Sequence, residues 1–179
     1  MGKLLIIAGN LASLKSTISK KLASSLNIPC INNDDIKELL VDVIDFKTRE
    51  ENLKLSQATY QLIKYVSAQV LSSESKLIIE SNFKPYEIKE LMTKLSFDST
   101  KVKMLFLTGN PAILYERYLA RQENRHRAHT STGLISYPVF EKSMLKVDDF
   151  DFPEILEIDT TIFLDKDFEI LKTKLIEFF

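Results

Sequence analysis

The stretch from Lys3 to Thr17 constrains the fold more than any other part of this 179-residue chain. An apolar run over residues 4–8 ends at Gly9, and a helical pattern takes over after Thr17. This order predicts a strand, a loop and a helix, the opening of a βαβ unit. The successive backbone N–H groups of such a loop, together with the start of the helix, form a concave site for anions. We therefore expect an anion-binding loop between the strand and the helix.

The loop reads G-x-x-x-x-L-K-S-T, which departs at one position from the phosphate-binding pattern G-x-x-x-x-G-K-[ST]. Leu14 replaces the second glycine. We expect Lys15 to contact the β- and γ-phosphates of a nucleotide and the Ser16 hydroxyl to bind Mg²⁺. The alternative is an ordinary βα turn that carries Lys-Ser by chance. The candidate nucleotide-binding residues are Gly9, Asn10, Leu11, Ala12, Ser13, Leu14, Lys15, Ser16 and Thr17.

Length, charge and cysteine content narrow the classes of protein to which the chain can belong. A chain of this length fits a single domain, residues 1–179, with one core. The net charge of -1 gives no basic field, so nucleic acid is not an expected partner. The single Cys30 excludes an internal disulfide and favours a buried structural thiol. No apolar run approaches a membrane span, and no room is left for a signal peptide, so we expect a cytoplasmic protein. The sequence leaves the oligomeric state open.

Apolar periodicity predicts alternating strands and helices along the chain. The expected strands cover residues 4–8, 28–31, 77–79, 102–107 and 155–158. The expected helices cover residues 17–26, 34–44, 58–71, 85–95, 112–122, 139–146 and 168–178, with the charged residues 47–54 as a solvated break. This alternation predicts a parallel sheet covered by helices on both faces, with ligands bound outside the carboxyl ends of the strands.

Acidic residues follow two of the expected strands. Asp34 and Asp35 come after an Asn32-Asn33 turn, and either of them is expected to cap the next helix. Because both acids cannot cap well, Asp34 is also a candidate to accept a proton from an attacking hydroxyl or to hold Mg²⁺. Glu80 ends an apolar strand, as a Walker-B carboxylate does, and it would hold the metal or orient a substrate. Whether the metal acid is Asp34 or Glu80 stays open.

A row of arginines precedes a polar segment. Arg117, Arg121 and Arg125 are spaced by four residues, so they share one helical face if the helix continues. Like charges in this arrangement repel, and an anion opposite them would relieve the repulsion. The alternative is a solvated face with ion pairs to neighbouring glutamates. Periodicity then disappears over residues 123–136, which predicts a lid that excludes water from the site.

These motifs together resemble the P-loop small-molecule kinases. That group contains shikimate and gluconate kinases, chloramphenicol phosphotransferase and zeta toxins. The resemblance rests on AGNLASLKST, INNDDIKELL, LIIESNF and ERYLARQENRHRAH, in this order, with a lid pattern like R-H-x-x-H at residues 125–129. It implies a three-layer α/β fold with a five-stranded parallel sheet of order 2-3-1-4-5. It also implies ATP and Mg²⁺ as cofactors and transfer of the γ-phosphate to a hydroxyl of a small molecule.

The resemblance also implies roles for individual residues. Lys15 and Asp34 are implied to be catalytic, with Asp34 as the general base and, beside Ser16, a metal ligand. Arg121 and Arg125 are implied to contact the γ-phosphate. Arg117 is implied to stack on adenine, next to the loop that carries Asp159 and Thr160. The candidate residues for the acceptor are Asp34, Lys37, Glu80 and Phe83, the last of which is alternatively a core aromatic.

Two other functions compete with this reading. Leu14 in place of glycine is consistent with a degenerate ATP-binding module that has little or no kinase activity. A polynucleotide 5′-end kinase is a weaker alternative, because the near-neutral charge argues against it. The identity of the acceptor is beyond the sequence.

Overall fold

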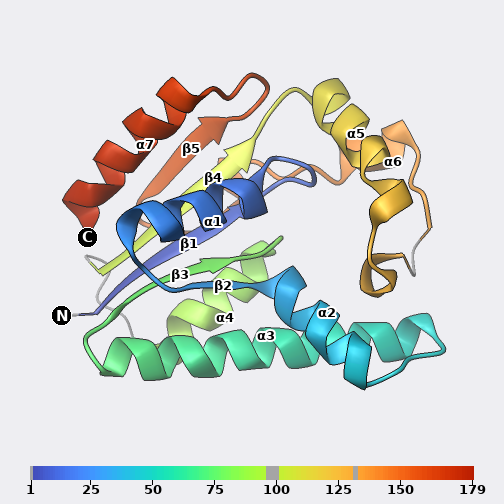
Figure 1. Cartoon of the computed structure of the whole chain (residues 1–179), viewed down its shortest axis with the longest axis horizontal. Coiled ribbons are helices and arrows are strands. Elements are labelled where there is room, and N and C mark those ends of the chain that lie inside the picture. The colour runs from blue at the N-terminus through green and yellow to red at the C-terminus, as the bar shows by residue number, and fades with distance from the viewer. Residues whose placement is uncertain (1, 96–100, 131–132) are drawn as a thin grey trace.

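The computed structural model describes residues 2–95, 101–130 and 133–179, with the side chain of residue 124 left aside. Strands and helices alternate along the chain (Figure 1). The strands are β1 (Lys3–Gly9), β2 (Cys30–Asn32), β3 (Lys76–Glu80), β4 (Val102–Thr108) and β5 (Ile155–Asp159). The helices are α1 (Lys15–Leu26), α2 (Asn33–Val43), α3 (Arg49–Ser72), α4 (Pro85–Leu95), α5 (Pro111–Ala120), α6 (Tyr137–Lys142) and α7 (Asp165–Phe178). Short 3₁₀ turns cover η2 (Gln122–Asn124), η3 (Arg127–His129) and η4 (Val147–Asp149).

The five strands form one parallel sheet in the order β2-β3-β1-β4-β5. This confirms the predicted fold class and strand order. The central strand β1 pairs with β3 on one side and β4 on the other, so residues 4–8 are fully buried. A strand enclosed on both faces has to be apolar throughout, which is why its sequence shows no alternation.

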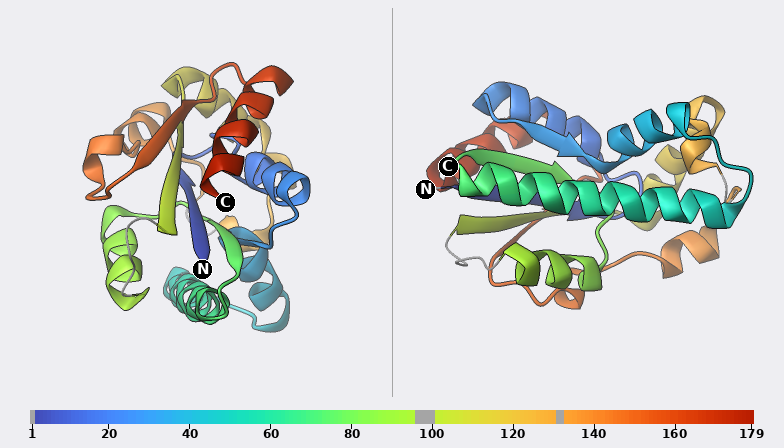
Figure 2. Two further views of the ribbon diagram at one scale, coloured as in Figure 1. Left: turned by 90° about the vertical axis from the view of Figure 1, so that its left-hand side faces the viewer. Right: turned by 90° about the horizontal axis from the view of Figure 1, so that it is seen from below.

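Helices cover both faces of the sheet (Figure 2). Leu5 and Ile7 of β1 pack with α1 and α7 in one apolar cluster. Leu4, Ile6 and Ala8 face the opposite side, where α3 and α4 complete a second cluster. The carboxyl ends of the strands point toward the end of the molecule where α2, α5 and α6 lie, and the termini lie at the other end (Figure 1). The candidate site is therefore built at the edge that the sequence predicted.

The first turns of α3 correct one sequence expectation. Residues 47–54 were expected to be a solvated break, but α3 begins at Arg49. The Thr48 hydroxyl accepts a hydrogen bond from the backbone N–H of Glu51, and the Glu51 carboxylate accepts one from the backbone N–H of Thr48. This capping box starts the helix although the following residues are charged. The charged composition concealed the cap.

The start of α2 differs as well. Asn32 rather than Asp34 or Asp35 caps the helix, because its side-chain oxygen accepts hydrogen bonds from the backbone N–H groups of both acids. Strand β2 correspondingly runs over residues 30–32 and not 28–31. Both carboxylates are thereby released from capping.

Other boundaries move by a few residues. Helix α5 ends at Ala120, so Arg121 terminates it and Arg125 lies in extended backbone beyond it. The condition for a shared helical face of the three arginines is therefore not met. Helix α6 spans 137–142 instead of 139–146, and α7 begins at residue 165 instead of 168. In the part of the chain that the structure describes, no helix has the length and apolarity needed to cross a membrane.

Candidate nucleotide and acceptor site

The loop between β1 and α1 needs unusual backbone angles at several positions. Gly9 has a φ of 140°, and a Cβ atom there would lie 2.1 Å from the carbonyl oxygen of Leu107 on β4. Only glycine fits this close approach. Ala12 and Leu14 both have a φ of 62°, in the left-handed region. The chain therefore turns twice through a conformation that L-residues disfavour, as a nest of backbone N–H groups does.

Leu14 occupies the left-handed position directly before α1, with φ 62° and ψ 17°. For a residue with a Cβ atom, this conformation costs about 1–2 kcal/mol. The Leu14 side chain packs against the apolar cluster of β1, α1 and α7. The backbone conformation expected of a glycine at this position is thus kept in spite of the leucine, and packing offsets part of the strain.

Lys15 is held ready at the start of α1. It is 7% exposed, and its Nζ donates a 2.7 Å hydrogen bond to the carbonyl oxygen of Asn10. Burial lowers the pKa of Lys15 to about 8, although the nearby Glu80 and Asp34 carboxylates act in the opposite direction. The Ser13 hydroxyl donates to the same carbonyl at 2.8 Å. A bound phosphate would replace these neutral partners with a stronger, charged one.

The Asn10 side chain makes a tertiary contact that the sequence does not predict. Its amide accepts from the backbone N–H of Leu145 at 2.7 Å and donates to the Leu145 carbonyl at 3.0 Å. A further 3.0 Å bond joins it to the Thr108 hydroxyl. Asn10 therefore ties the loop to a segment 135 residues later in the chain. No local pattern marks such a contact.

Glu80 lies at the carboxyl end of β3, 4% exposed. Its Oε2 accepts a 3.1 Å hydrogen bond from Ser16 Oγ and another from Asn32 Nδ2. Burial raises the pKa of Glu80 to about 7, against the effect of the Lys15 ammonium group. A serine hydroxyl beside a buried carboxylate is an oxygen donor pair that suits Mg²⁺.

The described residues contain no cluster of three or more His, Cys, Asp or Glu side chains able to hold a metal ion. Mg²⁺ in nucleotide sites usually takes one or two protein ligands and fills its other positions with phosphate oxygens and water. The Ser16–Glu80 pair fits that mode. It favours Glu80 over Asp34 as the metal acid, because Asp34 does not contact Ser16 and its side chain is 54% exposed.

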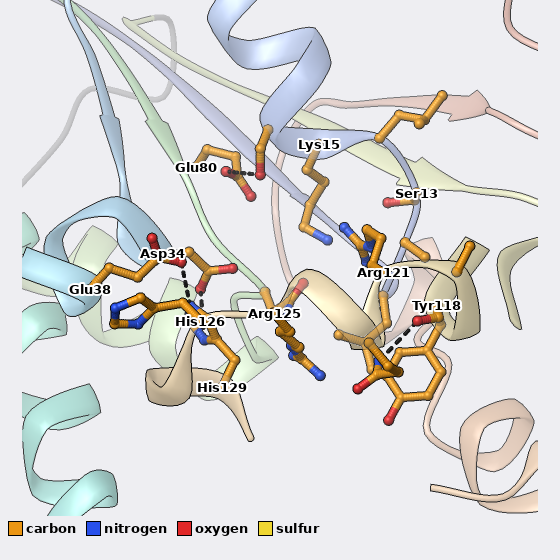
Figure 3. Close-up of a pocket in the computed structure, with 17 residues that line it drawn as sticks. Ser13, Lys15, Asp34, Glu38, Glu80, Tyr118, Arg121, Arg125, His126 and His129 are labelled. Carbon is orange, nitrogen blue, oxygen red and sulfur yellow. Dashed lines mark hydrogen bonds and ion pairs between the residues drawn. The ribbon is translucent and has the colours of Figure 1, made fainter. Parts of the chain in front are cut away.

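A polar cavity of about 360 Å³ opens at this edge of the sheet (Figure 3). The loop forms one wall, α2 a second and the segment after α5 a third. Its lining brings together these predicted site residues: Leu11, Ala12, Ser13, Leu14, Lys15, Ser16, Asp34, Glu80, Arg121 and Arg125. Glu38, Asn82, Tyr118, His126 and His129 also line it, and the sequence reading had not assigned them to the site. The roles of all these residues stay predictions.

The three arginines separate into two groups. Arg121 and Arg125 line the cavity, where burial lowers the pKa of Arg121 and the Arg125 guanidinium lies 5.8 Å from the ring centre of Tyr118. Arg117 instead donates a 2.9 Å hydrogen bond to the carbonyl of Thr161. That carbonyl belongs to the loop after β5, beside a shallow hollow lined by Gly109, Asn110, Asp159, Thr161 and Ile162. The arrangement puts Arg117 next to the predicted adenine loop.

The predicted adenine-loop residues differ in exposure. Thr160 is fully buried, and its hydroxyl donates to the carbonyl of Thr108 at 2.8 Å, so its side chain holds the loop to β4. Asp159 is exposed, and hydrogen bonds from Thr161 hold the pKa of its carboxyl below the usual range. Of the two, only Asp159 presents its side chain at the surface of the hollow.

Two acceptor candidates lie elsewhere. Lys37 is buried, and its Nζ donates to the carbonyl of Ala128 at 2.9 Å, as Asn52 Nδ2 does at 3.0 Å. Phe83 is 1% exposed in the core, with its ring edge toward Tyr60. Neither lines the cavity in this structure: Lys37 contacts the Ala128 carbonyl and Phe83 lies in the core. Their assignment to the acceptor stays a prediction. The sequence does not indicate which backbone carbonyl a helical lysine near the site will bind.

The segment predicted to be a lid is docked on α2 and the residues after it. His126 Nε2 pairs with Asp42 at 3.1 Å, Arg127 with Asp45 at 2.6 Å, and His129 Nε2 with Glu38 at 2.9 Å. Ala128 is fully buried against Val41 and Leu55. The R-H-x-x-H pattern therefore marks the attachment of the lid to α2. Residues 131 and 132 of the predicted lid lie outside the described residues.

Solved structures of low sequence identity share this fold, which is that of P-loop kinases. A "putative kinase" from Chloroflexus aurantiacus aligns with a TM-score of 0.80 at 22% identity, covering 99% of this chain and 98% of its own. A sugar kinase from Janibacter aligns with a TM-score of 0.65 at 14% identity over 98% and 95% of the two chains.

Kti12 from Chaetomium thermophilum, solved with ADP-AlF₃, aligns with a TM-score of 0.65 at 14% identity over 97% of each chain. No protein-family model matches the sequence, and no curated protein matches it. The likeness in fold leaves the activity to be argued from the site.

Proposed function

We propose that the protein transfers the γ-phosphate of ATP to a hydroxyl group of a small molecule. The observation that carries this proposal is one polar cavity that joins the phosphate-binding loop, the Ser16–Glu80 pair, Asp34 and two lid arginines. Each part matches a need of phosphoryl transfer, which depends on positioning and on charge stabilisation more than on covalent catalysis.

In the proposed reaction, the acceptor oxygen attacks the γ-phosphorus, and the bond from that phosphorus to the oxygen bridging to the β-phosphate breaks. ADP leaves, and the hydroxyl proton passes to the Asp34 carboxylate. Lys15, Arg121 and Arg125 balance the charge on the phosphoryl oxygens. Ser16 and Glu80 would hold Mg²⁺, which supplies further charge neutralisation when bound.

The docked lid supports transfer to an acceptor over loss of phosphate to water. Because segment 125–129 is fastened to α2, Arg125, His126 and His129 line the cavity together with Asp34. Closure of this kind excludes bulk water from the reacting groups.

The test is incubation with ATP, Mg²⁺ and a panel of small alcohols, sugars and nucleosides, followed by detection of phosphorylated product. Lys15→Met, which keeps the length of the side chain but not its charge, is expected to weaken ATP binding and abolish transfer. Unchanged nucleotide affinity in Lys15→Met, with no product from the unaltered protein, would contradict the proposal.

A degenerate nucleotide-binding module is the second candidate, favoured by the strained backbone of Leu14. Tight Mg·ATP binding without transfer, together with transfer gained in Leu14→Gly, would support it. Measurable transfer by the unaltered protein excludes it.

A further inference from the structure

The two histidines of the lid are used differently. His126 has both ring nitrogens engaged: Nδ1 accepts from the backbone N–H of Ala128 at 3.2 Å, and Nε2 faces Asp42 at 3.1 Å. It therefore caps the η3 turn and fastens it to α2. This is a positioning role, and it leaves His126 no ring nitrogen available to bind a ligand.

His129 has one nitrogen engaged. Its Nε2 lies 2.9 Å from the Glu38 carboxylate, which has to receive a proton from it because both carboxylate oxygens are acceptors. A neutral ring that donates through Nε2 carries a lone pair on Nδ1. Among the described residues, Nδ1 makes no hydrogen bond, and Asp34 Oδ1 lies 3.9 Å from it. The imidazole side chain is 11% exposed and faces the cavity (Figure 3).

With the ring neutral, Nδ1 of His129 and Oδ1 of Asp34 are two acceptor atoms 3.9 Å apart in the lining of the cavity. Glu38 lies one turn further along the same face of α2. A ligand that presents hydrogen-bond donors matches these hydrogen-bond acceptors. A ligand that presents a carboxylate would be repelled by them. One hydroxyl cannot satisfy both atoms, because it has a single proton to donate.

We infer that the acceptor is a polyol with hydroxyl groups on adjacent carbons. The attacking hydroxyl donates to Asp34, and its neighbour donates to Nδ1 of His129, while Glu38 fixes the ring in the required tautomer. The inference deepens the proposed function and rests on it. The balance of the transfer is unchanged: the oxygen–phosphorus bond forms, ADP leaves, and the proton of the attacking hydroxyl goes to Asp34.

The lid consequently supplies part of the acceptor site. His129 reaches Asp34 only because η3 is docked on α2, so closure of the lid brings the second binding atom into place. This links acceptor recognition to closure. It also explains why both ring nitrogens of His126 are hydrogen-bonded, whereas, within the described part of the chain, only one nitrogen of His129 is.

Glycerol and 1,3-propanediol provide a matched pair of probes, since they differ only in the central hydroxyl. We expect kcat/KM for phosphorylation of glycerol to exceed that for 1,3-propanediol by about tenfold or more, because the second compound leaves a polar atom unpaired. His129→Leu is expected to bring the ratio close to one, and His129→Gln to restore part of it through its amide oxygen. Lys20→Met, whose exposed pair with Asp35 does not touch segment 125–129, is expected to keep it.

A second readout is independent of turnover. The chain has only two histidines, so imidazole ¹⁵N spectra contain two residues and the His126→Gln variant assigns them. With a non-hydrolysable ATP analogue and Mg²⁺ present, glycerol should shift the Nδ1 resonance of His129, and 1,3-propanediol should leave it in place.

Equal use of both probes, or a ratio that survives in His129→Leu, overturns the inference. Absence of transfer to glycerol and of any His129 shift, in a protein whose ATP binding depends on Lys15, overturns the polyol class and leaves the nucleotide site standing. Absence of ATP binding itself would instead remove the proposed function.

Discussion

Ser16 Oγ donates a 3.1 Å hydrogen bond to Oε2 of Glu80, which joins the first turn of α1 to the end of β3. Burial raises the pKa of Glu80 from its ordinary 4.5 to about 7. Between these pH values the folded protein keeps a proton on Glu80 that the unfolded chain has lost. The stability associated with the protonated form is therefore present below pH 4.5 and is lost as the pH rises toward 7.

The first prediction concerns the Glu80→Gln variant, which resembles the protonated acid at every pH. Relative to the unaltered protein, its free energy of unfolding should rise by up to about 3 kcal/mol as the pH goes from 4.5 to 8, without Mg²⁺. Urea unfolding of both proteins across this range measures the difference. A gap that stays constant with pH would show that the burial of Glu80 has no energetic cost. The variant should also lose Mg²⁺-dependent activity.

The shifted pKa of Lys15 makes stability depend on pH in the opposite direction. Burial lowers its pKa from 10.5 to about 8, so the unfolded chain binds more protons than the folded protein between these values, and stability rises with pH there. ATP, however, needs the charged lysine. We expect ATP affinity to fall above pH 8, by up to about tenfold per pH unit, and to lose this dependence in Lys15→Met. Titration calorimetry from pH 7 to 9.5 tests this, and parallel curves for the two proteins would contradict it.

Two substitutions separate the effect of Leu14 on stability into a backbone contribution and a packing contribution. Leu14→Ala removes the packing and keeps a Cβ atom at φ 62°, whereas Leu14→Gly also removes the strain. The glycine variant should be more stable than the alanine variant by about 1–2 kcal/mol, measured by denaturant unfolding. Equal stabilities would mean that the left-handed conformation of this residue is not strained. If the strain also distorts the loop, ATP affinity will be higher in Leu14→Gly than in Leu14→Ala.

The lid prediction uses Lys37, whose ammonium donates to the carbonyl of Ala128. Lys37→Met keeps the stem and removes the donor, and a hydrogen bond of this kind contributes about 1.5–3 kcal/mol. We expect amide hydrogen exchange of residues 126–130 to accelerate about tenfold or more, with a fall in transfer rate. Lys20→Met is the matched control, because its exposed pair with Asp35 does not touch the lid. Equal protection in both variants would show that Lys37 does not hold the lid closed.

Local pattern predicted much of the fold and part of the site. The apolar runs predicted the five strands and their alternation with helices. The run is clearest in β1, because a strand buried on both faces has to be apolar throughout. Asp34 and Glu80 could be located because polar residues after such strands meet at one edge. The capping box at Thr48 and Glu51 was readable from the sequence as well, but the charges around it concealed the cap.

The rest depended on contacts between distant segments. The sequence by itself located the loop between β1 and α1, the polar residues at the carboxyl ends of the strands and the arginine-rich segment after α5. Each of these follows from spacing within a few residues. Only the tertiary structure decided that Lys37 holds the lid, that Asn10 grips the backbone of Leu145, that Arg117 lies apart from Arg121 and Arg125, and that His129 faces Asp34. Long side chains span several ångströms, and their partners are fixed by packing between elements far apart in the chain, which no local period records.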